Sequence, residues 1–217
     1  MIEIFSLQLT SFNLSANFLN DVLSHGEKER AGRFKFREHR RNFVLSHGIL
    51  HWLLSRKLGC TPREVQWEFG QFGKPFLPDC SFSFNMSHSH EVALYAISSI
   101  GDIGVDVEYV KPSVAFEDLP WDSLMPEEQT VLLKASPKDR REIFYQIWTK
   151  KEAVGKALGI GLSAISKNIP SGWNFYMPQL PSHYYGAIAF PVLNPHIVER
   201  QVILSDKVDP STRPYKF

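Results

Sequence analysis

The segment WTKKEAVGKALGIGL (residues 148–162) places an acid and several bases on a predicted helix. Helix geometry puts Trp148, Glu152 and Lys156 along one edge, within about 80° of arc, because they are four residues apart. We predict one long helix from Pro137 to Leu158, with its apolar face toward the core. Glu152 and Lys156 then lie at the margin of that face, beside an expected cleft. The predicted buried residues are Ile143, Ile147, Val154 and Leu158.

Strands and helices recur with similar content in both halves of the chain. Up to residue 110, strands are predicted at 2–9, 64–69, 91–98 and 102–110, with a helix at 40–59. After residue 110, helices are predicted at 125–136 and 137–158, followed by strands near 173–177, 184–190 and 200–205. The pattern predicts an α+β fold of two similar subdomains, residues 1–101 and 102–217, with a cleft between them.

The composition limits the class of protein. The chain has 217 residues, 43% of them hydrophobic, and 24 Lys and Arg against 23 Asp and Glu, so a core is expected and nucleic-acid binding is not. Cys60 and Cys80 are too few for a disulfide framework. The start, MIEIFSLQLTSF, lacks the basic region of a signal peptide, and no apolar run reaches the ~18 residues of a membrane span. We therefore expect a cytoplasmic protein without a membrane anchor.

A pair of acids lies on one predicted strand. In GVDVEYV, Asp106 and Glu108 are two residues apart and share one face of the strand, with Val105 and Val107 on the other. Such a pair is either a solvated strand face or a site for a hard cation. Mg²⁺ takes oxygen ligands, often one or two carboxylates with phosphate oxygens, and Glu152 is a candidate third acid.

Two further segments are candidates for anion binding. SFNMSHSHEVAL (83–94) places Ser87 and His88 in a predicted polar loop before a strand, where they form either an ordinary turn or a phosphate contact. A zinc site is disfavoured there, because no further ligand follows at the usual spacing. The run GEKERAGRFKFREHRR (26–41) holds seven Lys and Arg against three Glu. It is either a solvated helix face or an anion site that Lys74 could also reach.

Four motifs in this order, FGKPFLPD, FNMSHS, IGVDVE and WTKKEAVGKALGIGL, resemble those of the 4′-phosphopantetheinyl transferases. The resemblance covers about residues 26–162 and is to the pseudo-dimeric group that activates carrier proteins of non-ribosomal peptide and polyketide synthases. It implies two subdomains related by a pseudo-two-fold axis, each a small antiparallel sheet packed on a long helix. It also implies that coenzyme A binds between them, that a serine of an apo acyl or peptidyl carrier protein attacks its β-phosphate, and that 3′,5′-ADP leaves.

The resemblance also assigns site residues. The expected Mg²⁺ ligands are Asp106, Glu108 and Glu152. The expected coenzyme A contacts are Lys28, Arg41, Lys74, Ser87, His88, Lys151 and Lys156. Asn42 and His51 stand where the family usually has arginines; the adjacent Arg40 or Arg41 could substitute at the first position, and Arg41 is taken as the candidate. Glu152 either ligates the metal only or also accepts the serine proton, and Lys156 is expected to keep it ionised and to offset charge on the leaving phosphate.

The resemblance implies a monomer whose partners are coenzyme A and the apo carrier protein. Two alternatives use the same groups. One is a Mg²⁺-dependent hydrolase of coenzyme A or of nucleotide diphosphates, with water as the nucleophile. The other is a protein that binds coenzyme A without turnover.

Overall fold

The computed structural model describes residues 1–11, 21–111, 114–160 and 169–202. Its helices and strands follow one another along the chain as β1 (Ile2–Gln8), η1 (Leu9–Ser11), α2 (His25–Gly32), α3 (Arg37–Leu58), η2 (Pro62–Glu64), β2 (Glu68–Phe69), β3 (Pro75–Phe76), β4 (Ser83–Ser89), β5 (Val92–Ser98), β6 (Gly104–Tyr109), η3 (Phe116–Asp118), η4 (Trp121–Ser123), α4 (Pro126–Lys134), α5 (Arg140–Leu158), β7 (Asn174–Tyr176), β8 (Tyr184–Phe190) and β9 (Ile197–Gln201). The predicted α+β class is confirmed.

The strands form two principal sheets and a short hairpin. The first sheet has the order β4-β5-β1-β9, the second has the order β6-β8-β7, and β2 pairs with β3. Among the described residues, all strand pairs are antiparallel except β1 with β9, which is parallel. The expectation of a purely antiparallel first sheet is therefore wrong, because the chain returns after β8 and lays β9 along the free edge of β1. The division at residue 102 stays a prediction, with the qualification that β9 joins the first sheet.

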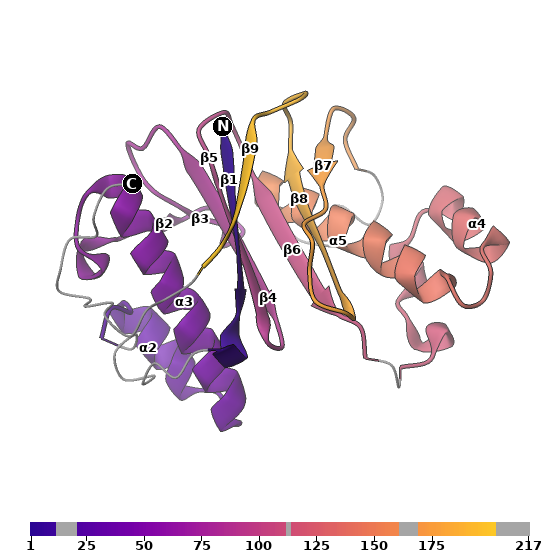
Figure 1. Cartoon of the computed structure of the whole chain (residues 1–217), viewed down its shortest axis with the longest axis horizontal. Helices are drawn as coiled ribbons and strands as arrows, with labels where there is room; N and C mark the ends of the chain where they lie inside the picture. Colours follow the sequence, from indigo (N-terminus) through magenta and orange to yellow (C-terminus); the bar gives the residue numbers. More distant parts are fainter. Residues whose placement is uncertain (12–20, 112–113, 161–168, 203–217) are drawn as a thin grey trace.

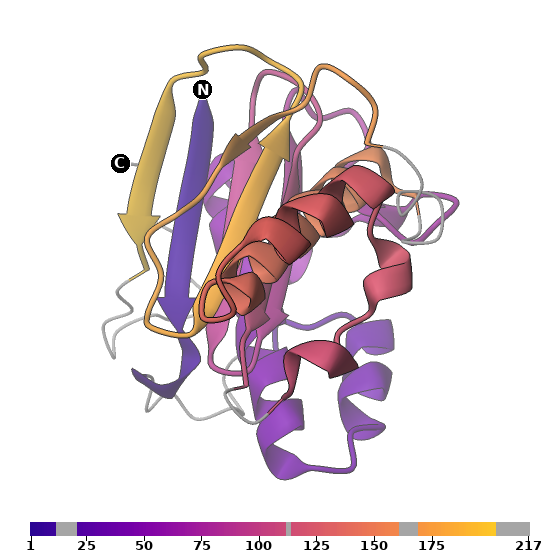
Figure 2. The same ribbon diagram turned by 90° about the vertical axis from the view of Figure 1, so that its right-hand side faces the viewer.

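Alternation along the strands explains the layers. In β5, Val92, Leu94 and Ala96 face the second sheet, whereas alternate residues such as Tyr95 face α3. In β8, Ile188 likewise faces the first sheet, while its neighbours face α5. The layers therefore follow in the order α3, first sheet, second sheet and α5, with helices on the two outer faces (Figures 1 and 2).

Helix α5 lies unusually close to the second sheet. A Cβ atom on Gly104 of β6 would lie 1.9 Å from the backbone oxygen of Ala153, so only glycine allows this approach. In the same region, Ala153 and Val154 of α5 pack with Ala187 and Ala189 of β8, and Ala157 lies next to Gly104. The close approach holds the C-terminal half of α5 over β6, which carries the acids.

The predicted apolar stripe of α5 is only partly right. Val154 is buried, but Leu158 is 39% exposed, and Ile143 and Ile147 are only half-buried. The residue that is fully buried in the first half of the helix is Phe144. The stripe shifts because the first half of α5 packs on the segment around α4 and the second half packs on β6 and β8.

Other expected elements have mixed outcomes. The helix at 40–59 is confirmed as α3, which begins at Arg37. The strand at 64–69 is wrong except for 68–69, because Glu64 ends a 3₁₀ turn and residues 65–67 pair with no strand. The polar loop at Ser87 and His88 is also wrong, because both belong to β4. Of the predicted strand at 200–205, residues 203–205 lie outside the described residues.

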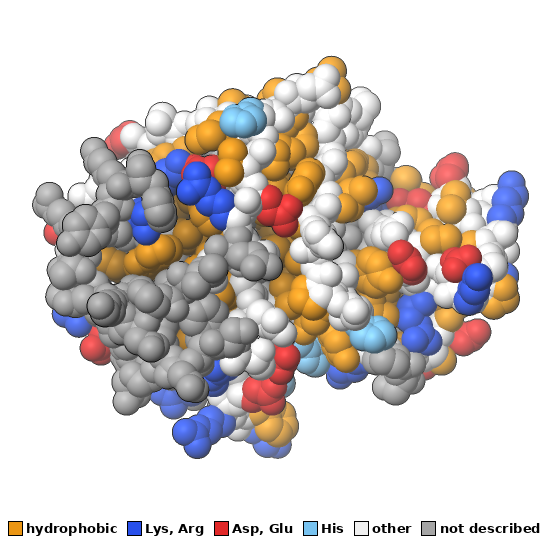
Figure 3. All heavy atoms as spheres, viewed as in Figure 1, with side chains coloured by type: hydrophobic (Ala, Val, Ile, Leu, Met, Phe, Trp, Pro, Cys, Tyr) orange, Lys and Arg blue, Asp and Glu red, His pale blue; other side chains and the backbone are white. Residues whose placement is uncertain are grey.

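Within the described part of the chain, no helix is both long and apolar enough to cross a bilayer. On the face shown in Figure 3, acidic and basic side chains are interspersed, in keeping with the formal net charge of +1.

Candidate functional site

The central constellation lies where β4, β6 and α5 meet. The ammonium nitrogen Nζ of Lys156 donates to Asp106 Oδ1 at 2.6 Å and to Ser87 Oγ at 2.9 Å. Ser87 Oγ also lies 3.2 Å from Asp106 Oδ1 and donates to it. Asp106 is 2% exposed, so the ion pair is shielded from water on the acid side. The structure thus brings together three of the residues that the sequence predicts.

One carboxylate oxygen of Asp106, Oδ2, is buried without a hydrogen-bond partner among the described residues. A buried carboxylate oxygen without a partner is costly, so such an atom commonly marks the place of a ligand. Oδ2 is therefore available to a cation or a donor that enters the site.

Glu108 and Glu152 lie close enough to Asp106 to feel its charge. Burial, and then repulsion by Asp106, raise the pKa of Glu108 to about 7. The same two causes raise the pKa of Glu152 to about 7, and the attraction of Lys156 only partly opposes them. Lys156 thus favours the ionised form of Glu152, as expected from the sequence, but its pairing with Asp106 accompanies only a partial offset of burial and repulsion. Crowded acids of this kind favour a bound cation.

The acids fit a magnesium ion by their chemistry. All are carboxylates, one carries an orphaned buried oxygen, and two have pKa values raised by burial and by repulsion from Asp106. Among the described residues, however, no three His, Cys, Asp or Glu side chains are already gathered as a metal-binding group. The assignment of Asp106, Glu108 and Glu152 as metal ligands stays a prediction.

His88 lies on the other face of β4, toward α3. Burial, together with the nearby positive charges of His47, Lys156 and Arg30, lowers the pKa of His88 to about 4. The imidazole is therefore neutral at neutral pH, in an electropositive surrounding that suits an anion. Arg30 belongs to the candidate basic run 26–41 without being singled out in it, and His47 is not among the residues predicted from the sequence. The available signal was the spacing of His47 and His51 on α3, four residues apart, so that both can meet one partner.

That partner is Glu27. Its Oε1 lies 2.7 Å from His47 Nδ1 and its Oε2 lies 2.9 Å from His51 Nε2. Oε2 also accepts from the backbone N–H and the hydroxyl of Ser24, which caps α2. Burial raises the pKa of Glu27, but the hydrogen bonds from His47, His51 and Ser24 together outweigh it and hold the pKa well below its usual range. His51 thus has a structural role in fixing α2 to α3.

We expect the Glu27 cluster to stabilise the fold above acidic pH. A carboxyl whose pKa is lowered by folding contributes stability above its ordinary pKa of 4.5, and the contribution is lost as pH falls through the lowered value. Glu27→Gln should therefore be less stable than the parent in urea unfolding at pH 7, with the difference shrinking below pH 4.5. Glu29→Gln, an exposed neighbour on α2, is the control. A constant difference from pH 7 to pH 3 would contradict the prediction.

Two of the predicted coenzyme A contacts lie elsewhere on α2 and α3. Lys28 is exposed on α2. Arg41 donates through Nη2 to the backbone oxygen of Leu9 at 3.1 Å. Asn42, which stands at the usual arginine position, is buried and donates to the backbone oxygen of His90 at 2.8 Å, so it ties α3 to the β4–β5 turn. The assignments of Lys28 and Arg41 stay predictions, and Arg30 is the residue of the run 26–41 whose charge is felt by His88.

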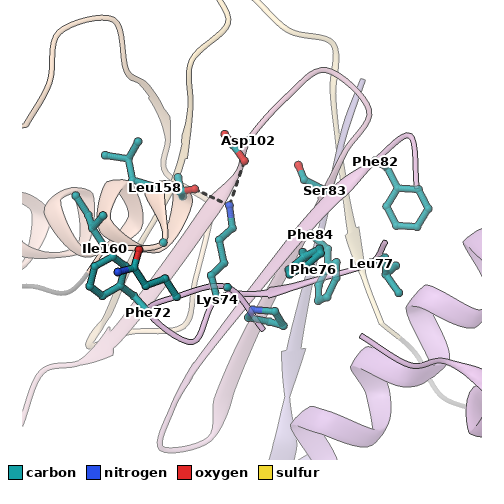
Figure 4. Close-up of a pocket in the computed structure, with 15 residues that line it drawn as sticks. Phe72, Lys74, Phe76, Leu77, Phe82, Ser83, Phe84, Asp102, Leu158 and Ile160 are labelled. Carbon is teal, nitrogen blue, oxygen red and sulfur yellow. Dashed lines mark hydrogen bonds and ion pairs between the residues drawn. The ribbon is translucent and has the colours of Figure 1, made fainter. Parts of the chain in front are cut away.

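Lys74 links the β2–β3 hairpin to the end of α5. Its Nζ donates to the backbone oxygen of Ala157 at 2.5 Å and to Asp102 Oδ1 at 3.2 Å. Lys74 also lines a cavity of about 390 Å³ between the hairpin and the end of α5. Figure 4 shows Phe72 and Ile160 on one side of Lys74 and Phe76 and Phe84 on the other. Aromatic walls with one cation suit a planar group attached to an anion. The other residues lining it include Leu77, Phe82 and Leu158.

Lys151 points away from the acids. Its Nζ donates to Glu128 Oε2 of α4 at 2.7 Å, and the Lys151 side chain is 3% exposed. Glu128 also accepts from the backbone N–H of Met125 at the start of α4. The pair therefore fastens α4 to α5, and a coenzyme A contact for Lys151 stays a prediction.

Lys151→Met should destabilise the protein by about 3 kcal/mol, because it leaves the mostly buried Glu128 carboxylate without its cation. Replacing both partners, in Lys151→Met with Glu128→Leu, should recover part of that loss. Urea unfolding measures both, and Lys150→Met is the control at a neighbouring lysine that lies over the Phe175 ring. Unchanged stability with weakened coenzyme A binding would instead assign Lys151 to the coenzyme.

Family comparisons agree with the motifs. The model of the 4′-phosphopantetheinyl transferase superfamily matches residues 102–180, which include the acids and α5. The model of the 4′-phosphopantetheinyl transferase N-terminal region matches residues 12–99, which include β4. The two matches meet at the boundary between the two sheets that form the site.

The similar proteins reported next are all named as phosphopantetheinyl transferases. The chain is 38% identical over 150 residues to the 4′-phosphopantetheinyl transferase HetI of Nostoc sp., covering 67% of this chain and 63% of the relative. It is 33% identical over 159 residues to the L-aminoadipate-semialdehyde dehydrogenase-phosphopantetheinyl transferase of Schizosaccharomyces pombe, covering 65% and 60%. It is 28% identical over 142 residues to the 4′-phosphopantetheinyl transferase Sfp of Bacillus subtilis, covering 65% and 62%. With both family models matched in order around one acidic site, the chain belongs to the 4′-phosphopantetheinyl transferase superfamily.

Proposed function

We propose that this protein transfers the 4′-phosphopantetheine group of coenzyme A to a serine of an apo acyl or peptidyl carrier protein. The matched region covers 63%, 60% and 62% of the three relatives named above, so the activity rests on the site as well as on the names. The observation that carries the proposal is the Lys156–Asp106–Ser87 constellation with its orphaned carboxylate oxygen. It offers charge neutralisation for a diphosphate beside a place for a cation.

The balance of the reaction is simple. The serine oxygen forms a bond to the β-phosphorus of coenzyme A, the bond to 3′,5′-ADP breaks, and the serine proton must be removed. Phosphoryl transfer depends mainly on positioning and on neutralising charge. Lys156 and Ser87 present donors at one point, so we assign to them the contact with the diphosphate. A bound Mg²⁺, held by Asp106, Glu108 and Glu152, would supply further neutralisation of the phosphate oxygens.

Glu152 is the candidate acceptor of the serine proton. Its pKa of about 7 is close to neutral pH, where a general base is most effective. It is half-buried on α5, one turn from Lys156, so a hydroxyl that enters beside the diphosphate can reach it. Replacement of Glu152 by Gln and by Asp distinguishes a base from a residue that only ligates the metal.

The nucleotide half of coenzyme A is assigned to two places. The cavity around Lys74 has aromatic walls for a purine. His88, with Arg30 and His47 nearby, has the positive surroundings that a phosphate requires. Lys28 and Arg41 are retained as candidates for the outer phosphate contacts.

Some finer features are also proposed. A pseudo-two-fold relation between the halves is supported by one sheet and one long helix in each, with both helices ended by a left-handed glycine, Gly59 and Gly159. Action as a monomer on carrier proteins of peptide or polyketide synthases follows from the resemblance alone, and a cytoplasmic location follows from the sequence features given above. Magnesium dependence is a proposal of the same kind.

Mass spectrometry of a panel of apo carrier proteins tests the activity. With coenzyme A and Mg²⁺, we expect one carrier to gain the mass of phosphopantetheine, with an equal release of 3′,5′-ADP. Release of nucleotide without any carrier would indicate the hydrolase instead, and tight coenzyme A binding without release would indicate a binding protein. No observation on the site favours either alternative.

A further inference from the structure

The two sheets meet along β4 and β6 without a backbone ladder between them. β4 ends the order of the first sheet and β6 ends the order of the second. Every strand pair recorded for the described residues lies within one sheet. Yet β4 and β6 are in extensive contact, and both sides of the acidic constellation come from them. Something other than a strand ladder must therefore hold the two edges in register.

Side-chain oxygens of β4 take the place of that ladder. Asn85 Oδ1 accepts from the backbone N–H of Val105 at 2.9 Å. Ser89 Oγ accepts from the backbone N–H of Tyr109 at 3.1 Å. Both bonds join residues 20 apart, so the strands run in the same direction with a constant offset. Asn85 is 5% exposed, and Val105 is fully buried.

The acceptor side chains of β4 and the outward-pointing backbone amides of β6 both recur at every second residue. Asn85, Ser87 and Ser89 lie on one face of β4, because alternate residues of a strand share a face. Along the edge of β6, every second N–H points outward, away from β8. The two bonds therefore lie on either side of the point where Ser87 meets Asp106 and Lys156.

Ser89 has a second contact. Its hydroxyl donates to Glu108 Oε2 at 3.3 Å while its oxygen accepts from Tyr109. A hydroxyl can do both at once, since it carries one proton and two lone pairs. Ser89 thus fixes the backbone of β6 and orients one of its acids.

We propose that Asn85 and Ser89 are positioning residues that hold β6 against β4, and so fix Asp106 and Glu108 relative to Ser87 and Lys156. The effect of Asn85 and Ser89 on turnover rests on the proposed function. Their effect on the position of β6 rests only on the hydrogen bonds to its backbone. Without its acceptor, a buried N–H must separate from β4 or remain unpaired, and either outcome loosens the acids.

Hydrogen exchange of single amides tests the contact itself. Ser89→Thr keeps the hydroxyl. Ser89→Val places a side chain of nearly the same shape as threonine at this position, but without the hydroxyl. We expect exchange at the Tyr109 amide to be faster in Ser89→Val, on the order of tenfold, with the Val105 amide unchanged and Ser89→Thr close to the parent. Asn85→Leu should show the converse, with faster exchange at Val105. Equal protection of Tyr109 in the Val and Thr variants would overturn the proposal.

Magnesium titration without coenzyme A tests the consequence for the acids. Weaker binding by Ser89→Val than by Ser89→Thr supports positioning, and equal binding contradicts it. In transfer assays, the Val variant should lower kcat with little change in the KM for coenzyme A, because the nucleotide contacts are elsewhere. If the parent shows no transfer at all, the proposed function fails, while exchange and titration still decide the role of Ser89. If Ser89→Val does not fold, Ser89→Ala is compared with Ser89→Thr by the same criteria.

Discussion

Asp106→Ala is expected to lower carrier-protein modification by about 10³-fold or more, which is the scale for loss of a preorganised charge at a reacting phosphate. Asp106 anchors Lys156 and Ser87 through Oδ1 and offers the orphaned Oδ2 to a cation. Without Asp106, Lys156 and Ser87 lose the carboxylate oxygen that positions them, and the cation site loses one of its oxygen ligands. Initial rates of carrier modification at saturating coenzyme A and Mg²⁺ measure the effect.

Two variants make the Asp106 result specific. Asp106→Asn keeps the shape and an acceptor oxygen for Lys156, so a loss as large as that of Ala assigns the effect to charge. Asp21→Asn removes a carboxylate charge from an exposed pair with Arg63, remote from the site, and should leave the rate unchanged. Circular dichroism should show a folded protein in each case. Undiminished transfer by Asp106→Ala with Mg²⁺ present would reject the assignment.

Glu152→Gln is expected to lower the rate by about 10²-fold to 10⁴-fold, the usual contribution of a general base, and the loss should persist at saturating Mg²⁺. Gln keeps an oxygen that can ligate a metal but has no basic carboxylate. Burial and the neighbouring Asp106 raise the pKa of Glu152 to about 7, a suitable value for a base at neutral pH. Rates measured over a range of Mg²⁺ concentrations separate the two roles.

Glu152→Asp is the matched control. It keeps the carboxylate but shortens its reach, so added Mg²⁺ should restore much of its activity if ligation is what suffers. Near-complete restoration of Glu152→Gln by Mg²⁺ would show that Glu152 only ligates, and that the serine proton leaves by another route.

The acidic strand and the helix above it could be predicted because their geometry is local. Asp106 and Glu108 share a face through the two-residue repeat of a strand, and Glu152 and Lys156 share an edge through the helical repeat. The α+β class followed from the same periodicities. Strand β4 was missed because SFNMSHS has polar residues on one face, which resemble a turn until β6 covers them.

The sequence by itself determined which residues share a face, and hence that acids, bases and a serine–histidine motif are available to one site. Only the tertiary structure decided which partner each of them meets. Lys151 and Lys156 are both bases on α5, yet one pairs with Glu128 and the other with Asp106. Periodicity gives the direction of a side chain, but the partner comes from a distant segment, as with Lys156 and Ser87, which are 69 residues apart. That choice depends on how the layers pack, here on the glycine at 104 that lets α5 approach β6.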